Sequence, residues 1–303
     1  MRVVRWLLAV VAVVAVAAMG TLTLAPGAVV SATQWQAARS AGLSDRSIEI
    51  DGRAVHYFEG GTGPTMVFLH GMGDDRHSFV ATAGAFTDTH RVILPDLRGH
   101  GDNAYDATLD HAIPGQRAHV AALVDALGLE RFVLVGNSMG GHVSASYALA
   151  RPETLEGLVL VNAPGLVVDD TVVYGGFGAP LAGPEDLDAL MARVLYEPPS
   201  VPGPIKRHMV EATNARVDDV DAMARAVREG PEHDLSDRIG TLSVPTLVLW
   251  GEADVVVPFA VGEAYAARIP EAELVVLPEA GHSPQLEAAD RVAAEIETWM
   301  AGL

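Results

Sequence analysis

The stretch Gly136-Asn137-Ser138-Met139-Gly140 follows an apolar run, residues 132–135, and precedes an alanine-rich segment of helical composition. A G-x-S-x-G sequence between a strand and a helix predicts a sharp turn that exposes the serine hydroxyl. Glycine is needed on both sides of the serine because side chains there would collide with the neighbouring strand and helix. Five residues can match this pattern by chance, so its meaning depends on the rest of the chain.

Strand and helix patterns alternate on both sides of this turn. Six short apolar runs are typical of strands buried on both faces: Thr65 to Leu69, Arg91 to Leu94, Phe132 to Val135, Leu158 to Val161, Pro245 to Trp250 and Leu274 to Leu277. Helical periodicity lies between them, for example in residues 118–127 and 292–300. Ahead of them, alternating residues around Asp51-Gly52 predict a hairpin. The order predicts an α/β fold with a mostly parallel central sheet flanked by helices.

The alternation stops between residues 165 and 239. Apolar side chains recur there at helical spacing from Leu187 to Leu195, and again from Val217 to Val227. Two amphipathic helices without a strand between them predict a helical cap, residues 165–239. The cap would interrupt a core made of residues 33–164 and 240–303.

The composition excludes several classes of function. The formal net charge is −19 over 303 residues, and Lys206 is the one lysine, so nucleic acid is not expected as a partner. The absence of cysteine removes disulfides, thiolate catalysis and cysteine-based metal sites. The histidines show no H-x-H or H-E-x-x-H spacing, so neither a metal nor a cofactor is expected. Nothing in the sequence implies an obligate protein partner.

The N-terminal segment, residues 1–32, predicts export. It opens with the basic stretch Met1 to Arg5, and no charged residue follows from Trp6 until Arg39. A run of this length and apolarity predicts a membrane anchor, with a cleaved signal peptide as the alternative. The catalytic domain is then expected at the periplasmic or extracellular face, bound to the membrane through this segment, or secreted if the segment is cleaved.

A serine hydroxyl needs an adjacent base to act as a nucleophile at neutral pH. His282 follows the last apolar run and a short loop, so we expect it at the same sheet edge as Ser138. Asp254 follows the preceding run and is the expected carboxylate partner of the histidine, with Glu252 as the competing acid. The chain order Ser, Asp, His is that of one large class of hydrolytic folds.

The oxyanion of an acyl-transfer intermediate needs N–H donors that are already in position. The backbone amide of Met139, directly after the serine, is one expected donor. The amide of Met72, in the His70-Gly71-Met72-Gly73 stretch after the first core run, is the other.

Five motifs in the sequence together resemble the α/β-hydrolase fold superfamily: His70-Gly71, Asp96-Leu97-Arg98-Gly99-His100-Gly101, Gly136-Asn137-Ser138-Met139-Gly140-Gly141, Gly251-Glu252-Ala253-Asp254 and Gly281-His282. The resemblance runs from about residue 47 to the C-terminus. Within the superfamily the chain is most similar to membrane-anchored monoacylglycerol lipases. This implies a serine hydrolase acting on carboxylic esters, such as monoacylglycerol or a similar lipid. We expect Gly71 of the oxyanion loop and Phe177 and Leu187 of the cap to contact substrate.

Two other functions stay open at this point. The Gly-Asn-Ser-Met-Gly-Gly sequence also resembles meta-cleavage-type C–C bond hydrolases, although those enzymes commonly carry Trp after the catalytic histidine, where this chain has Ser283. A hydrolase fold can also serve as a non-catalytic binding protein. Such proteins often lose a member of the catalytic set, and none is missing here.

Overall fold

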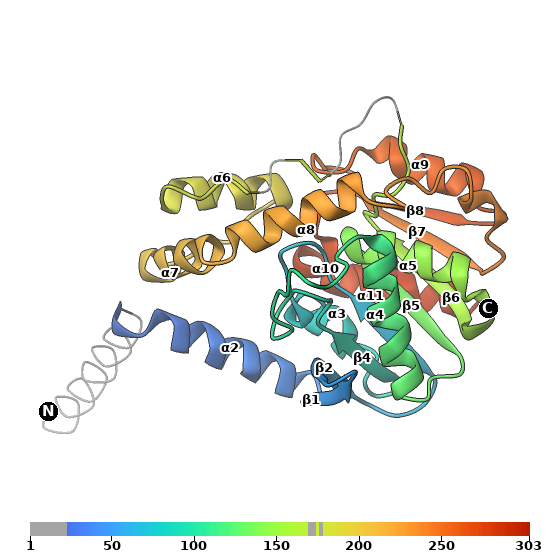
Figure 1. Ribbon diagram of the computed structural model, residues 1–303, viewed down its shortest axis with the longest axis horizontal. Coiled ribbons are helices and arrows are strands. Elements are labelled where there is room, and N and C mark those ends of the chain that lie inside the picture. The colour runs from blue at the N-terminus through green and yellow to red at the C-terminus, as the bar shows by residue number, and fades with distance from the viewer. Residues whose placement is uncertain (1–22, 169–173, 176–177) are drawn as a thin grey trace, which may run out of the picture.

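The computed structural model describes residues 23–168, 174–175 and 178–303, and it is built on one eight-stranded sheet (Figure 1). The strands are β1 Leu43–Ile50, β2 Arg53–Gly60, β3 Thr65–Leu69, β4 Arg91–Pro95, β5 Phe132–Asn137, β6 Leu155–Val161, β7 Thr246–Gly251 and β8 Glu273–Leu277. Their order in the sheet is β1-β2-β4-β3-β5-β6-β7-β8. The strands from β3 to β8 are parallel, whereas β1 and β2 pair antiparallel. The predicted mostly parallel sheet is therefore confirmed.

The hairpin of β1 and β2 closes through Asp51 and Gly52, which have φ of 52° and 74°. Two consecutive residues with positive φ give the two-residue turn that matches the twist of antiparallel strands. The predicted hairpin is also confirmed.

Helices cover both faces of the sheet, and the alternation of side chains along each strand separates two cores. In β5, Leu134 joins one cluster, while Val133 and Val135 join the other. The first cluster packs beneath α4 Ile113–Ala126, α5 Met139–Ala150 and α9 Phe259–Arg268. The second packs against α3 Val80–Gly84 and α11 Ala289–Met300. Burial on both faces explains why the sequences of β3 to β7 are almost continuously apolar.

Among the described residues between β6 and β7, the α-helices are α6 Pro184–Val194, α7 Gly203–Asn214 and α8 Val217–Glu229. We call residues 165–239 the cap. Its helices lie to one side of the sheet (Figure 1). The helices α6 and α8 fall where the apolar spacing predicts them, whereas α7 has no counterpart in the sequence prediction. The limits assigned to core and cap remain a prediction.

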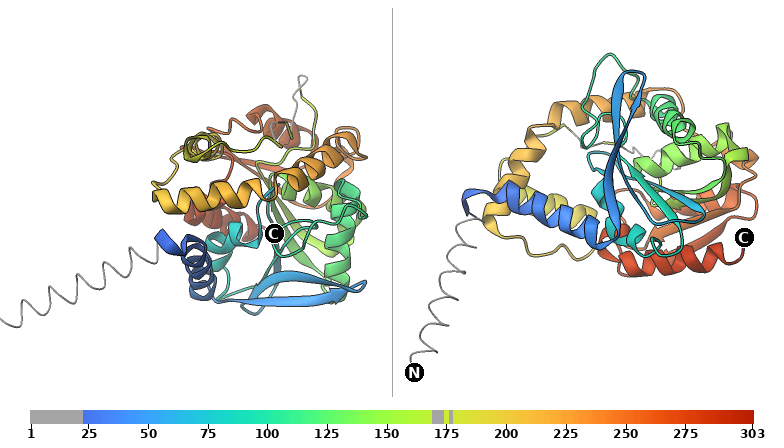
Figure 2. Two further views of the ribbon diagram at one scale, coloured as in Figure 1. Left: turned by 60° about the vertical axis from the view of Figure 1, so that its left-hand side comes forward. Right: turned by 90° about the horizontal axis from the view of Figure 1, so that it is seen from below.

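Helix α2, Pro26–Ser40, lies along the core and reaches the cap (Figure 2). Near its C-terminal end Ala38 is buried, and the ring of Trp35 lies 5.8 Å from that of Phe58 on β2. Near its N-terminal end Gly27 faces His208 of α7, and a Cβ on that glycine would come within 2.8 Å of the imidazole. The helix therefore contacts both parts of the protein.

The predicted membrane-anchored location is wrong and is corrected here. Within residues 23–168, 174–175 and 178–303, no helix is long and apolar enough to cross a bilayer. Residues 26–32 of the predicted anchor belong to α2, whose 15 residues span only about 22 Å, less than the ~30 Å of a hydrocarbon core. That helix packs on protein through Trp35 and Ala38. Residues 1–22 lie outside the described part of the chain.

Candidate active site

Ser138 stands at the turn between β5 and α5 with φ of 52° and ψ of −124°. This is a strained backbone for a residue with a side chain. A Cβ on Gly136 would come within 2.3 Å of the Gly140 carbonyl oxygen, and a Cβ on Gly140 would meet the Leu69 carbonyl oxygen at the same distance. Both glycines are thus required by close backbone approach. The predicted strand–turn–helix geometry is confirmed.

His282 lies in the loop after β8, and its side chain is only 8% exposed. Its Nε2 is 2.9 Å from Ser138 Oγ, and its Nδ1 is 2.8 Å from Asp254 Oδ2. An ionised carboxylate can only accept hydrogen bonds, so the proton of the neutral ring sits on Nδ1. Nε2 is then free to accept the hydrogen of the serine hydroxyl.

Asp254 is fully buried and makes hydrogen bonds through both oxygens. Oδ1 accepts from the amides of Val256 and Val257 at 2.7 and 3.0 Å. Oδ2 accepts from His282 and, at 2.6 Å, from Nδ2 of Asn162. These donors replace the water that the buried carboxylate has lost. The competing acid, Glu252, is exposed instead.

Asn162 is a residue of this site that the sequence prediction missed. It is fully buried at the end of β6, with φ of 46°, and its Oδ1 accepts from Gly251 N at 3.2 Å. One amide side chain thus holds both the end of β7 and the carboxylate of Asp254. The available signal was a polar residue directly after a buried strand, at the same sheet edge as Ser138.

The loop after β3 brings Gly71 close to the serine, and Met72, the next residue, is half-buried and packs against the core. A Cβ on Gly71 would lie 3.2 Å from the Cβ of Ser138, so any larger residue would crowd the hydroxyl. Met139 is the first residue of α5, so its N–H is one of the four that have no acceptor within the helix. His70 braces this loop, because Nδ1 donates to Gly71 O at 2.8 Å and Nε2 accepts from Leu97 N at 3.0 Å.

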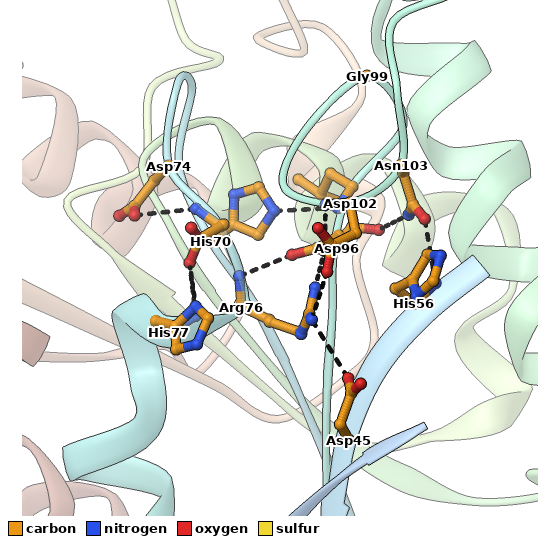
Figure 3. Close-up of polar contacts among 12 residues, drawn as sticks. Asp45, His56, His70, Asp74, Arg76, His77, Asp96, Gly99, Asp102 and Asn103 are labelled. Carbon is orange, nitrogen blue, oxygen red and sulfur yellow. Dashed lines mark hydrogen bonds and ion pairs between the residues drawn. The ribbon is translucent and has the colours of Figure 1, made fainter. Parts of the chain in front are cut away.

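A buried ionic network supports the base of the same loop (Figure 3). Arg76, 2% exposed in its side chain, pairs with the fully buried Asp96 and with Asp45 and Asp102. Asp96 Oδ1 also accepts from Arg76 N at 2.8 Å, and its Oδ2 accepts from Asp102 N at 2.9 Å. The loop after β3 is therefore tied to the loop after β4 and to β1.

Of the two substrate contacts predicted in the cap, the structure describes one. Leu187 is buried on α6, whereas Phe177 lies outside the described residues. His142, on α5, donates from Nε2 to the Glu232 carbonyl at 2.8 Å, so its Nδ1 accepts from Tyr174 OH at 2.9 Å, and burial lowers its pKa to about 4. It is therefore neutral near pH 7. No group of three or more metal-ligating side chains occurs in the described part of the chain.

The strand order and the serine at its strand–turn–helix corner define the α/β-hydrolase class of proteins. The profile of the Alpha/beta hydrolase family matches residues 66–295. The chain belongs to this family.

Individual relatives cover most of the chain. It is 32% identical over 259 residues to 2-hydroxy-6-oxo-6-phenylhexa-2,4-dienoate hydrolase of Comamonas testosteroni, covering 78% of this chain and 87% of the relative. It is 28% identical over 258 residues to Lipase 3 of a Moraxella species, covering 80% of this chain and 79% of the relative. The crystal structure of a membrane phospholipase A superposes with a TM-score of 0.83 at 29% identity, covering 100% of this chain and 99% of that one.

Proposed function

We propose that this protein hydrolyses carboxylic esters through an acyl-enzyme on Ser138. The observation that carries the proposal is the imidazole of His282, which contacts Ser138 Oγ on one side and Asp254 on the other. A serine, a base and a carboxylate in this relation are the parts of nucleophilic acyl transfer. The resemblance to a lipase and to a phospholipase A supports an ester as the substrate.

In the first half of the reaction, Ser138 Oγ attacks the ester carbonyl carbon and its proton passes to His282 Nε2. Asp254 stabilises the imidazolium that forms, and the amides of Met72 and Met139 bind the oxyanion. The bond to the alcohol then breaks as His282 returns the proton to the leaving oxygen. The acyl group remains on Ser138.

In the second half, a water molecule gives its proton to His282 and attacks the acyl carbon. The second tetrahedral intermediate collapses, the carboxylic acid leaves, and Ser138 recovers its proton. Binding of the substrate is assigned to Gly71 on the loop after β3 and to the cap, with Leu187 and Phe177 as the proposed apolar contacts. We infer from the apolar face of α6 that the acyl chain, such as that of a monoacylglycerol, occupies the cap side.

A meta-cleavage-type C–C hydrolase is the second candidate, because the Comamonas relative is such an enzyme by name and is 32% identical. Its substrate is a vinylogous diketone rather than an ester. The same nucleophile and base would serve both reactions, so only a substrate profile separates them.

A fluorophosphonate probe tests the proposal, because it reacts with an activated serine and not with an ordinary hydroxyl. Wild-type protein should be labelled to one probe per chain, Ser138→Ala should not be labelled, and Ser40→Ala, which changes an exposed serine of α2, should match wild type. An inert wild type would mean a non-catalytic binding protein.

A panel of substrates then identifies the reaction. We expect turnover of p-nitrophenyl octanoate and of a monoacylglycerol, and none of a vinylogous diketone. A preference for acetyl esters would leave an esterase without lipase character, and cleavage of the diketone alone would favour the C–C hydrolase.

A further inference from the structure

The loop that carries His282 is held through four of its backbone polar groups. His282 O accepts from Asn137 Nδ2 at 3.0 Å, and Gly281 O faces Asn162 Nδ2 at 3.4 Å. Both of these donors belong to the core. The two N–H groups point elsewhere: Gly281 N donates to Glu287 Oε1 at 2.6 Å, and His282 N donates to the carbonyl of Val194 at 2.8 Å.

The second pair of contacts involves the cap. Val194 is the last residue of α6, and Tyr196, two residues later, donates its backbone N–H to Glu287 Oε2 at 2.7 Å. The carboxylate of Glu287 therefore joins one N–H of the cap to one N–H of the loop that carries the base. Among the described residues, no arginine, lysine or histidine side chain forms an ion pair with Glu287, so its two oxygens serve these backbone groups.

The packing of Gly281 is independent evidence of the same contact. A Cβ on Gly281 would lie 2.9 Å from both Val194 O and Tyr196 N. The chain of the cap thus runs directly against the loop of the base, and a residue other than glycine would force the two apart.

We propose that Glu287 is a positioning residue that fastens the end of α6 to the His282 loop, so that docking of the cap holds the base beside Ser138. The inference rests on the proposed function. Displacement of residues 194–196 releases the N–H of His282 and takes the N–H of Tyr196 away from Glu287, while the carbonyl contacts of the loop with Asn137 and Asn162 stay. The cap then affects the chemical step as well as the fit of the substrate.

The variant Glu287→Gln tests this role with little change in volume. Its amide oxygen can accept from one N–H, but its NH₂ group cannot accept from the other. A displacement of the base by about 1 Å can cost about 100-fold in rate, and the loss of one hydrogen bond should move it less. We expect kcat to fall roughly 10-fold with KM nearly unchanged, for both an acetyl and an octanoyl ester. The matched control is Glu297→Gln, an exposed residue of α11 for which wild-type kcat is expected.

Rates are divided by the number of sites that the fluorophosphonate labels at saturation. A purely structural role would lower the labelled fraction and leave kcat per labelled site unchanged, which would overturn the inference. If the wild type is inert to the probe, the proposed function fails and the inference fails with it. A labelled wild type with an unaffected Glu287→Gln variant overturns the inference alone.

A second pair of variants tests the cap side without changing Glu287. Tyr196→Pro removes the N–H that Glu287 accepts, whereas Tyr196→Ala removes the same phenol ring and keeps the N–H. Leu195 has φ of −115° and ψ of 145°, which is compatible with a following proline. We expect kcat per labelled site to be several-fold lower for Tyr196→Pro than for Tyr196→Ala. Equal values would show that the cap contact does not position the base.

Discussion

The core and the cap of this protein are held together in different ways. Ten of the 12 residues of α5, in the core, are buried, whereas one of the 11 residues of α6, in the cap, is buried. The groups that contact Ser138 come from loops whose positions are set by parallel strands. Helix α6 reaches those groups through backbone hydrogen bonds near Val194, whereas α8 of the same cap buries Met223, Ala224 and Val227. The core therefore fixes the geometry of the proposed chemistry, while α6 can be altered at its exposed positions with little cost to the fold.

The largest difference is expected between two ion pairs. Arg76→Met leaves Asp96 buried without its charged partner, which costs about 3–5 kcal/mol of unfolding free energy. In the cap, Lys206 pairs with Asp188 at 2.6 Å near the surface, and Lys206→Met should cost less than about 1 kcal/mol. Denaturant unfolding of the two variants measures the difference. Equal losses would contradict the view that the core alone is rigidly specified.

Apolar packing sharpens the same comparison. Leu160 on β6 is fully buried, and Leu160→Ala should lower the unfolding free energy by about 2–5 kcal/mol. Leu190 on α6 is 40% exposed, and Leu190→Ala should change it by less than about 0.5 kcal/mol. The Leu190 variant is more informative for activity. If the substitution raises the KM for an octanoyl ester more than the KM for an acetyl ester, an acyl site on the cap is supported.

A substitution at Asn162 tests the part of the site that belongs to the core. Asn162→Ala removes the 2.6 Å hydrogen bond to Asp254 and leaves the carboxylate one donor short. We expect kcat to fall roughly 10-fold with KM nearly unchanged, whereas Leu187→Ala in the cap should mainly raise KM. Esterase kinetics on both variants provide the check. A change confined to KM in Asn162→Ala would remove this residue from the proposed site.

The smallest expected effect is the pH dependence of stability that Glu232, near the end of the cap, contributes. Partial burial alone would raise the pKa of Glu232, but hydrogen bonds from Arg117, Ser146 and Arg238 lower it to about 2. A lowered folded-state pKa stabilises the fold at pH values above the unfolded value of 4.5, and this contribution is lost as the pH falls toward 2.

Thermal unfolding of Glu232→Gln should therefore show a deficit at pH 7, on the order of 1 kcal/mol after allowance for solvent screening. The deficit should shrink between about pH 4.5 and pH 2. Exposed Glu297→Gln is the control. A deficit that is constant with pH would mean that charge on Glu232 does not fasten the cap.

The sequence predicts the core better than the cap for physical reasons. Short continuous apolar runs rich in β-branched residues favour strands buried on both faces, and β3 to β7 have this burial, whereas the edge strand β8 is partly exposed. Parallel strands end at one edge, which is why Ser138, Asp254 and His282 could be expected together. Asn162 and Glu287 belong to no motif, and their roles depend on contacts between residues about 90 apart in the chain.

Helix α2 shows why the sequence led to a wrong prediction of a membrane anchor. Hydropathy describes a segment in isolation, and residues 1–32 are apolar enough to predict an anchor. The structure places residues 26–32 in helix α2, which packs on β2 through Trp35 beyond the end of that segment, a contact that hydropathy does not contain. The helix α7 was missed because its large apolar residues are only Ile205, Met209 and Val210, fewer than the five that recur from Leu187 to Leu195.

The lone lysine has a practical consequence. Lys206 lies on α7 and the chain contains no cysteine, so an amine-reactive dye can attach to one side chain only, and that side chain belongs to the cap. A single cysteine introduced on the exposed surface of the core would accept a second dye. Once the α-amino group of the chain is blocked, the distance between the two dyes could be followed during turnover without the replacement of any native side chain.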